Sequence, residues 1–464
     1  MVQYTRVIKI FQERIYKNMT KNVKKRDAWS SRAGFILASA GSAVGLGNLW
    51  KFPYVVGKNG GGAFVLVYLA IMFTVGLSVV IAEIVLGRAT HKNVVGAYRQ
   101  LDKRFSHAGL LCVITAFGVI SFYSAVGGWT TKYMFTYIFT GLKNTTPEAY
   151  YQSFMSSSWQ TVLFQWLFML ATAVIVYKGI AHGIERASKM IMPILLLILI
   201  ILAVRSMTLP NAMEGVKFFL MPDFSKLTAK TVLYAMGQVF FSLSVGCGTL
   251  ITYGSYMKPS ENIPKTATFI PFIDTFIAML GGFAILPAVF AFGLEPGEGP
   301  GLTFQTLPHV FANLPGGRIF GALFFVLLFF AAVTSSISML EILVTYLTEE
   351  KQLSRKKAVL LLTAIILVLG LPCALSGGVL SELTIGGKTI FDLFDFTSST
   401  ILMPVGGLMM CIFIGYFWKP KNAIDELTNH GTVPMRFQRS WSFIIKFIAP
   451  IVIFSVIITS VFTG

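Results

Sequence analysis

Charged residues are scarce in this chain. Only 12% of its 464 residues are Asp, Glu, Lys or Arg, whereas a typical soluble domain carries about 25%. Hydrophobic residues make up 55% of the chain, and its mean hydropathy is +0.71. The shortage of charge and the repeated long apolar runs exclude an ordinary soluble protein and predict one that spans a lipid bilayer.

Cysteine and histidine are also rare. The four cysteines, Cys112, Cys247, Cys373 and Cys411, each lie in a separate apolar run, and the five histidines are scattered. This spacing excludes a disulfide framework and a zinc site. We find no nucleophile–base arrangement and no phosphate-binding loop, and the glycine clusters lie in apolar spans rather than after strands. The chain is therefore not expected to be an enzyme.

Acidic residues are outnumbered, since 20 Asp and Glu face 38 Lys and Arg. Most basic residues fall in connections on the amino-terminal side of the membrane, which predicts a cytoplasmic amino terminus in the plasma membrane. The basic residues are not clustered with aromatic residues, so nucleic acid is not an expected partner. The tail 1–29 is too polar for a signal peptide. It is either disordered or a surface-bound helix, and translation could also begin at Met19.

The apolar runs predict eleven membrane-spanning segments, and this odd number places the carboxyl terminus outside the cell. The segments are 31–57, 62–87, 108–141, 160–178, 187–205, 230–257, 263–293, 318–348, 357–375, 389–417 and 441–463. The outer connections 206–229 and 294–317 are expected to be partly structured. We divide the chain into a cytoplasmic tail (1–29), a first half (30–205), an extracellular connection (206–229), a second half (230–417), and a cytoplasmic loop with the last helix (418–464).

Two of these segments contain residues that interrupt a helix. The first carries AGSAVGLGNLW from Ala40 to Trp50, and the sixth carries FFSLSVGCG over 240–248. Each glycine in a helix interior costs about 1 kcal/mol relative to alanine. Backbone groups freed at membrane depth need protein or a watery cavity as a partner. Breaks in segments one and six predict two five-helix halves with a binding site at their interface, as in transporters of the LeuT type.

Four strings carry a family resemblance: WSSRAGFILASAGSAVGLGNLWKFPY, KNGGGAF, GQVFFSLSVGCGTLITYGSY and FFAAVTSSISMLE. They resemble the neurotransmitter:sodium symporter family, and the likeness runs from about Arg26 to Trp418. The resemblance implies an all-α LeuT-type fold with two inverted five-helix repeats, in which helices 1 and 6 unwind at the midplane. The eleven segments resemble the bacterial branch of the family. The implied activity is sodium-coupled amino-acid symport by alternating access.

The resemblance also implies a substrate site. Backbone N–H groups near Leu46 and Gly47 and the hydroxyl of Tyr123 would hold the substrate carboxylate. No acid lies near Ser42, which argues against an amine substrate. Cysteine at position 247 leaves room for a large side chain, so tyrosine or tryptophan is favoured, with leucine or methionine as the alternative. The implied substrate residues are Ser42, Ala43, Leu46, Gly47, Val119, Tyr123, Phe241, Ser242, Ser244, Cys247, Ser336 and Met339.

Two sodium sites follow from the same resemblance, built from the oxygen ligands that a hard cation prefers. Ala331, Thr334 and Ser335 share one helical face by their spacing. They would form one site with carbonyl groups of the first break, and the second would use Asp274 of the seventh segment. The implied ligands are Gly41, Ala43, Val44, Asn48, Ser242, Asp274, Ala331, Thr334 and Ser335.

Asp274 bears on chloride. Many family members have asparagine here and bind chloride nearby, with a serine one turn further on, where this chain has Ala278. A carboxylate at bilayer depth is costly unless it has a partner or a function. We expect it to supply the negative charge, so that transport does not require chloride. A protonated structural aspartate is the alternative.

The remaining implied positions form gates and supports. Lys51 and Asp395 would close the outer side, and lysine lacks the bidentate fork of the usual arginine. Glu83 and Glu341 would hydrogen-bond freed backbone at the breaks, and Tyr68 and Gln238 would orient Asp274. Arg26, Tyr256 and Glu349 would form the inner gate.

Three other classes of function remain open at this stage: a substrate-gated channel, an amino-acid sensor, and a proton-coupled permease that uses Asp274. The expected partners are an amino acid, sodium ions and the bilayer, and the oligomeric state is open.

Overall fold

The computed structural model describes residues 27–142, 145–294 and 301–463. The tail residue Arg26, expected at the inner gate, lies outside this part of the chain. Among the described residues, nine helices are long and apolar enough to cross a membrane, and the bent pair at the first break makes ten. The sixth predicted segment supplies the eleventh crossing. Its break leaves two pieces of 14 and 6 residues, and each is too short to be counted as a spanning helix by itself.

The eleven crossings follow one another as the sequence predicts. They are α2 (Arg32–Ala43), η1 (Gly47–Lys51) and α3 (Phe52–Lys58); α4 (Gly62–Ile71), η2 (Met72–Gly76) and α5 (Leu77–Thr90); α7 (Ser106–Phe139); α9 (Ser158–Tyr177); η4 (Ile180–Glu185) and α10 (Arg186–Met207); α12 (Ala229–Ser242) and α13 (Thr249–Gly254); α14 (Ile263–Ala291); α16 (Gly317–Glu350); α17 (Arg355–Leu369) and α18 (Leu371–Leu375); α19 (Ile390–Asp395), η7 (Phe396–Leu402), α20 (Met403–Ile412) and η8 (Phe413–Phe417); and α22 (Gln438–Phe443), η9 (Ile444–Ile448) and α23 (Ala449–Thr463).

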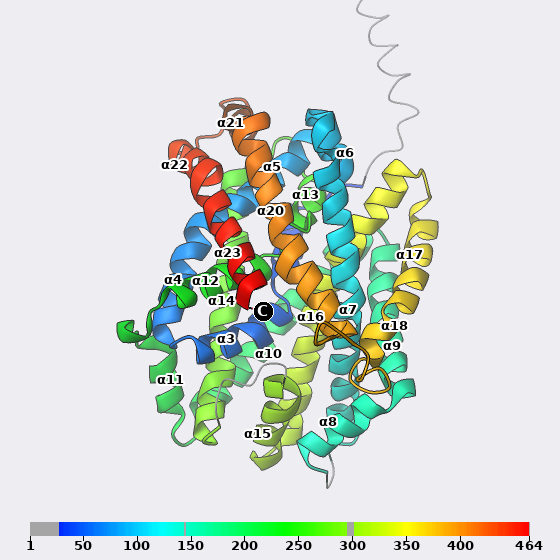
Figure 1. Ribbon diagram of the computed structural model, residues 1–464, viewed down its shortest axis with the longest axis vertical. Coiled ribbons are helices and arrows are strands. Elements are labelled where there is room, and N and C mark those ends of the chain that lie inside the picture. The colour runs from blue at the N-terminus through cyan, green and yellow to red at the C-terminus, as the bar shows by residue number, and fades with distance from the viewer. Residues whose placement is uncertain (1–26, 143–144, 295–300, 464) are drawn as a thin grey trace, which may run out of the picture.

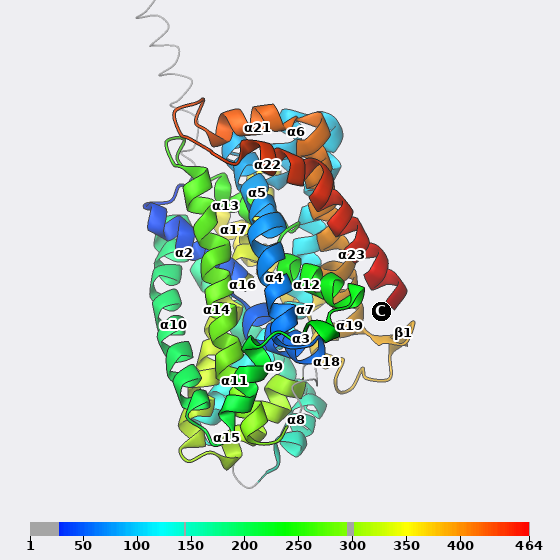
Figure 2. The same ribbon diagram turned by 90° about the vertical axis from the view of Figure 1, so that its left-hand side faces the viewer.

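Short elements cover the two ends of this bundle (Figures 1 and 2). Helices α6 and α21 lie at one end, and α8, α11 and α15 lie at the other. Both outer connections are partly structured, as predicted. The connecting elements are α6 (Val94–Leu101), η3 (Lys103–Phe105), α8 (Pro147–Ser156), α11 (Ala212–Leu220), η5 (Phe224–Lys226), η6 (Leu302–Thr306), α15 (Leu307–Asn313), β1 (Thr384–Ile385), β2 (Lys388–Thr389) and α21 (Pro420–Leu427).

The two strands form a small antiparallel hairpin in which Thr384 pairs with Thr389 and Ile385 with Lys388. Gly386 and Gly387 make the turn, with φ of 60° and 77°. Two successive residues with positive φ are what a tight two-residue hairpin requires, and glycine adopts them without strain.

Helices α7 and α16 form the centre of the bundle. Within their most apolar stretches, 72% of the α7 residues and 78% of the α16 residues are buried, against 22% for the last crossing, which includes α23. In a bilayer, helices on the rim keep an apolar surface toward lipid, whereas central helices bury theirs against protein. The pieces on either side of the two breaks therefore pack against a buried central helix, since α16 contacts both α2 and α13.

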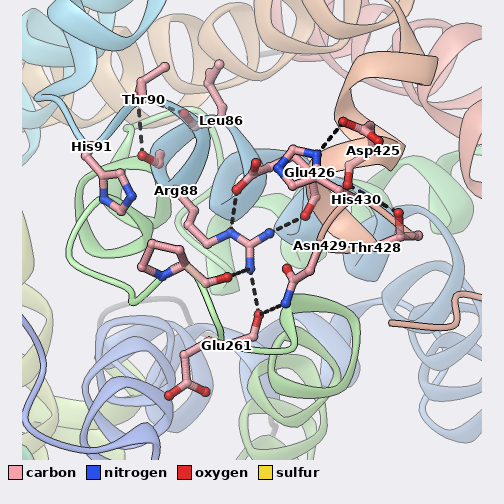
Figure 3. Close-up of polar contacts among 12 residues, drawn as sticks. Leu86, Arg88, Thr90, His91, Glu261, Asp425, Glu426, Thr428, Asn429 and His430 are labelled. Atoms are coloured by element: carbon pink, nitrogen blue, oxygen red, sulfur yellow. Dashed lines mark hydrogen bonds and ion pairs between the residues drawn. The ribbon is translucent and has the colours of Figure 1, made fainter. Parts of the chain in front are cut away.

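Arg88 ties three segments together at the end of the bundle that carries α6 and α21 (Figure 3). Its side chain is only 1% exposed. Its Nε donates to Glu426 Oε1 of α21 at 2.6 Å, and its Nη1 donates to the Glu261 carbonyl, also at 2.6 Å. Nη2 also donates to the Glu426 carbonyl. Asn429 Nδ2 donates to the Glu261 carbonyl at 3.4 Å, which links the turn after α21 to the loop after α13.

We expect Arg88→Gln to destabilise the fold strongly. Removing one partner of a buried ion pair typically costs about 3–5 kcal/mol, because the other partner keeps its desolvation cost. Thermal unfolding of purified protein should show a clearly lower midpoint. The matched control is Arg104→Gln, since Arg104 pairs with Asp102 but its side chain is 74% exposed, and exposed pairs contribute little. Equal midpoints for the two variants would contradict this role for Arg88.

Candidate functional site

The first break lies where the sequence predicts it. Helix α2 ends at Ala43 and the chain resumes a helical path at Gly47, with a bend of 50° between the two pieces. The Gly45 N–H is bound by the Asn48 side-chain oxygen at 3.2 Å, and the Leu46 N–H points at the Tyr123 hydroxyl at 3.5 Å. One helix end thus presents carbonyl groups and the other presents N–H groups at the same depth, an arrangement suited to a cation and an anion.

The second break separates α12, which ends at Ser242, from α13, which begins at Thr249. Ser244 has a φ of 51°, an uncommon value for a residue other than glycine. Glu83 of α5 accepts hydrogen bonds from the Gly246 N–H at 2.7 Å and the Leu250 N–H at 3.2 Å. These are the contacts that its predicted supporting role requires.

A small cavity lies between the two breaks. Nine of the twelve predicted substrate residues line it, and α7 and α16 supply the wall opposite the breaks. The lining residues are Ser42, Ala43, Gly45, Leu46, Gly47, Val119, Phe122, Tyr123, Phe241, Ser244, Ser335, Met339 and Met403. No acidic side chain is among these described residues, so the wall is apolar apart from hydroxyl and backbone groups.

Three predicted substrate residues do not line this cavity. Ser336 instead bonds the Thr172 hydroxyl at 2.7 Å, and Ser242 donates to Asp274. Cys247 is fully buried between Gly246 and Gly248, whose φ values are 91° and 81°. Cys247 is absent from the residues that line the cavity. Its size therefore bears less on substrate choice than the sequence suggests.

The predicted sodium ligands of α16 face the first break. The Ser335 hydroxyl donates to the Ser42 carbonyl at 3.1 Å, and the Thr334 hydroxyl donates to the Ala331 carbonyl at 3.0 Å. A Cβ placed on Gly41 would lie 3.4 Å from Thr334 Cβ, so α2 and α16 approach closely here. These hydroxyl groups and the carbonyl groups that they contact carry no formal charge. Val44 follows directly, as the cap of α2.

Asp274 of α14 is the centre of a second polar cluster and is fully buried. Asn48 Nδ2 donates to its Oδ1 at 2.8 Å, and the Ser242 hydroxyl donates to its Oδ2 at 2.9 Å. The Tyr68 hydroxyl also donates to Oδ2, at 3.5 Å. Gln238, predicted to orient this carboxylate, instead donates to the Gly47 carbonyl at 3.1 Å. Both broken helices thus meet at one carboxylate.

The outer pair, Lys51 and Asp395, forms no direct ion pair in this structure, although Asp395 acts electrostatically on Lys51. The Lys51 ammonium lies 3.9 Å from the centre of the Phe241 ring. Within the described part of the chain, the ion pairs do not include one between Lys51 and Asp395. The Phe241 ring lines the central cavity, so Lys51 covers one wall of it.

Glu341 contacts different groups from those expected. Glu341 accepts hydrogen bonds from the Tyr256 hydroxyl at 2.7 Å and from Arg355 Nη1 at 2.9 Å. The prediction that Glu341 bonds freed backbone at a break was wrong. Its two carboxylate oxygens instead accept from the Arg355 guanidinium of α17. Glu349 accepts from the Asn93 N–H, at the start of α6, at 2.7 Å.

Sequence reasoning missed several contributors to the site. Phe122 and Met403 line the cavity, and the Ser338 hydroxyl bonds that of Ser42 at 2.6 Å. Phe122 adjoins Tyr123 and Ser338 lies three residues after Ser335, so both had a local signal. Met403 had no such local signal, because it lies in the tenth crossing, far in sequence from the other residues of the site.

Comparisons with known proteins agree with this geometry. The model of the sodium:neurotransmitter symporter family matches residues 26–156 and 153–463. A Bacillus subtilis protein named uncharacterized sodium-dependent transporter YhdH is 41% identical over 92% of this chain and 95% of its own length. A Haemophilus influenzae sodium-dependent transporter is 38% identical over 96% of this chain and its full length.

One solved structure has the same fold. It is the crystal structure of MhsT in complex with L-phenylalanine, with a TM-score of 0.86 and 42% identity, covering 94% of this chain and 100% of that chain. This similarity shows the LeuT-type fold that the two breaks predicted. Because the matches extend over nearly the whole chain, this protein belongs to the sodium:neurotransmitter symporter family of sodium-dependent membrane transporters.

Proposed function

We propose that this symporter carries a large hydrophobic or aromatic amino acid into the cell, with tyrosine or tryptophan favoured. The observation that carries the proposal is the cavity between the breaks, where N–H groups and the Tyr123 hydroxyl meet an apolar wall without an acidic side chain. A zwitterion fits the two helix ends, and an apolar side chain fits Val119 and Met339. The L-phenylalanine bound by MhsT supports this substrate class.

Two sodium ions would accompany each substrate. One would lie among Ala331, Thr334, Ser335 and the carbonyl groups of α2, and the other beside Asp274. The carboxylate supplies the negative charge at the second site, so uptake needs no chloride. The bundle that contains the broken helices would rock against α7 and α16 to expose the cavity to each side in turn.

The proposed orientation follows the distribution of basic residues. The amino terminus and the end with α6 and α21 face the cytoplasm, and the carboxyl terminus faces the outside of the plasma membrane. The two inverted halves are 30–205 and 230–417.

Uptake into proteoliposomes tests this function. We expect accumulation of labelled tyrosine or tryptophan only with an inward sodium gradient, and unchanged accumulation when gluconate replaces chloride. A preference for leucine or methionine would overturn the choice of substrate alone. Binding without uptake would indicate a sensor, currents far above substrate flux a channel, and uptake driven by a proton gradient without sodium a proton-coupled permease.

Narrowing the cavity should change the substrate preference. Val119 is 3% exposed and lines the cavity from α7. Val119→Phe removes space that an aromatic ring would fill, and overpacking a tight site typically costs about 1–3 kcal/mol. Competition assays should show tyrosine and tryptophan losing roughly 10-fold or more in affinity relative to alanine. The control is Ile114→Phe on the lipid-facing side of α7, where Ile114 is 51% exposed; an equal change in both variants would contradict the prediction.

A further inference from the structure

Two hollows lie between α12 and α23, outside the central site. The outer cavity has a volume of about 340 Å³, and its walls include Lys51, Lys230, Tyr234 and Ser399. The lateral groove is a shallow channel of about 610 Å³ on the lipid-facing surface, lined by Ala229, Val232, Leu233, Phe454, Ser455, Ile458 and Thr459. Leu233 and Thr459 line both hollows. The outer cavity and the lateral groove are therefore neighbours that share a wall. Figure 2 shows the two helices concerned, α12 and α23.

The outer cavity is positively charged. It is lined by two lysines and, among its described lining residues, by no Asp or Glu. The Lys51 ammonium lies 3.9 Å from the Phe241 ring centre, and that of Lys230 lies 5.7 Å from the Tyr234 ring centre. Neither lysine takes part in a direct ion pair within the described chain, and Asp395, which does not line the cavity, acts on Lys51 electrostatically. The Ser399 hydroxyl, which also lines the cavity, is buried without a hydrogen-bond partner there. Such a wall attracts an anion.

The lateral groove is apolar and open to lipid. Phe454 is 55% exposed and Ile458 is 41% exposed, and the last crossing is the least buried of the described spans. An acyl chain loses little on leaving the bilayer for such a groove, because both surroundings are hydrocarbon. The charge next to the groove is therefore what distinguishes one lipid from another.

We propose that the outer cavity and lateral groove together bind a single-chain anionic amphiphile, a long-chain fatty acid, from the outer leaflet. Its carboxylate lies between Lys51 and Lys230, and its chain lies between α12 and α23. A zwitterionic amino acid fits less well, because the described lining of the cavity contains no carboxylate for its ammonium. The groove suits a single acyl chain, because only two helices, α12 and α23, form its described walls.

The proposal predicts inhibition of transport. A carboxylate bound to Lys51 competes with Asp395 for the ammonium and covers Phe241, which walls the central cavity. The fatty acid should therefore lower the maximal rate of uptake, since it occupies a different site from the substrate. This consequence and the choice of leaflet rest on the proposed sodium-coupled uptake and on the proposed orientation, whereas binding to the outer cavity and lateral groove does not.

Photolabelling of the full-length protein tests the binding. A diazirine-bearing palmitate in proteoliposomes should label residues 229–241 and 449–460. Excess oleate should compete, and oleyl alcohol, which has the same chain without the charge, should not. Lys230→Gln should weaken competition by oleate about tenfold, whereas Lys230→Arg should keep it. Lys58→Gln is the matched control, because Lys58 lies over Tyr54 and outside the lining of the outer cavity.

A second variant tests the groove. Ala229→Trp places a large side chain in the lateral groove and should reduce labelling of 449–460, whereas Val174→Trp on lipid-facing α9 should not. Equal competition by oleyl alcohol, equal labelling of Lys230→Gln, or labelling spread over other helices would overturn the proposal. If the protein is labelled as expected but shows no sodium-driven uptake, the proposed function is wrong and the proposed lipid site stands. If uptake is normal but no specific labelling occurs, the lipid site is wrong and the proposed function stands.

Discussion

Asp274→Asn is expected to abolish most sodium-coupled uptake in medium containing neither chloride nor another small anion. The carboxylate is fully buried and accepts hydrogen bonds from Asn48, Ser242 and Tyr68. Asparagine keeps the shape but removes the negative charge, and a sodium ion beside it loses its counter-charge in a region of low dielectric constant. Each charge that crosses 100 mV contributes about 2.3 kcal/mol. Loss of one of two sodium ions would halve the electrical driving force and lower accumulation about 50-fold.

The measurement is uptake of the labelled amino acid against sodium concentration in proteoliposomes. Asp274→Asn combined with Ala278→Ser should recover part of the uptake when chloride is added. Thr268→Ala on the same helix is the control, because its hydroxyl bonds only the Pro264 carbonyl of its own helix. An Asp274→Asn protein with normal chloride-free uptake would show that the carboxylate is structural and protonated.

Gly45→Ala should eliminate substrate binding. A Cβ at this position would lie 2.5 Å from Ser335 Oγ and 3.2 Å from the Tyr123 hydroxyl. A contact of 2.5 Å cannot persist, so the methyl group would displace a proposed sodium ligand and fill space that the substrate carboxylate needs. We expect binding of radiolabelled substrate to detergent-solubilised protein to fall at least 100-fold, about 2.7 kcal/mol.

Gly407→Ala provides the matched control. A Cβ there would lie 3.6 Å from Val245 Cγ1, an ordinary van der Waals contact, and the residue is in α20 near the second break. Gly407→Ala should bind substrate normally, since the added methyl group meets only ordinary contacts and alanine is favoured over glycine within a helix. Near-normal substrate binding by Gly45→Ala would mean that the carboxylate lies elsewhere.

Much of the fold was predictable from local patterns. Long apolar runs fix where helices cross a bilayer, and glycine, serine and asparagine inside two of those runs marked the breaks at 44–46 and 243–248 that the structure contains. The helices at the ends of the bundle were harder. Helix α21 carries charged residues and is only 8 residues long, so it gives no apolar signal of its own.

The site was less predictable than the fold. The family strings identified residues that line the cavity, but they did not show which way Cys247 and Ser336 point. In the structure Cys247 is buried outside the cavity lining, and the Ser336 hydroxyl bonds that of Thr172. Glu341 likewise meets Arg355 because α17 begins beside it. The direction of a side chain depends on the helices that pack around it, and a sequence motif gives no information about those helices.

The sequence by itself determined the membrane location, the order of the crossings and the two interrupted helices, because apolar runs and helix-breaking residues act over a few turns of one segment. Only the tertiary structure decided which distant groups meet. Glu83 reaches Gly246 across 163 residues, and Arg88 reaches Glu426 across 338. Such contacts depend on how the crossings pack, and packing is set by the shapes of all the helices together rather than by any one stretch of chain.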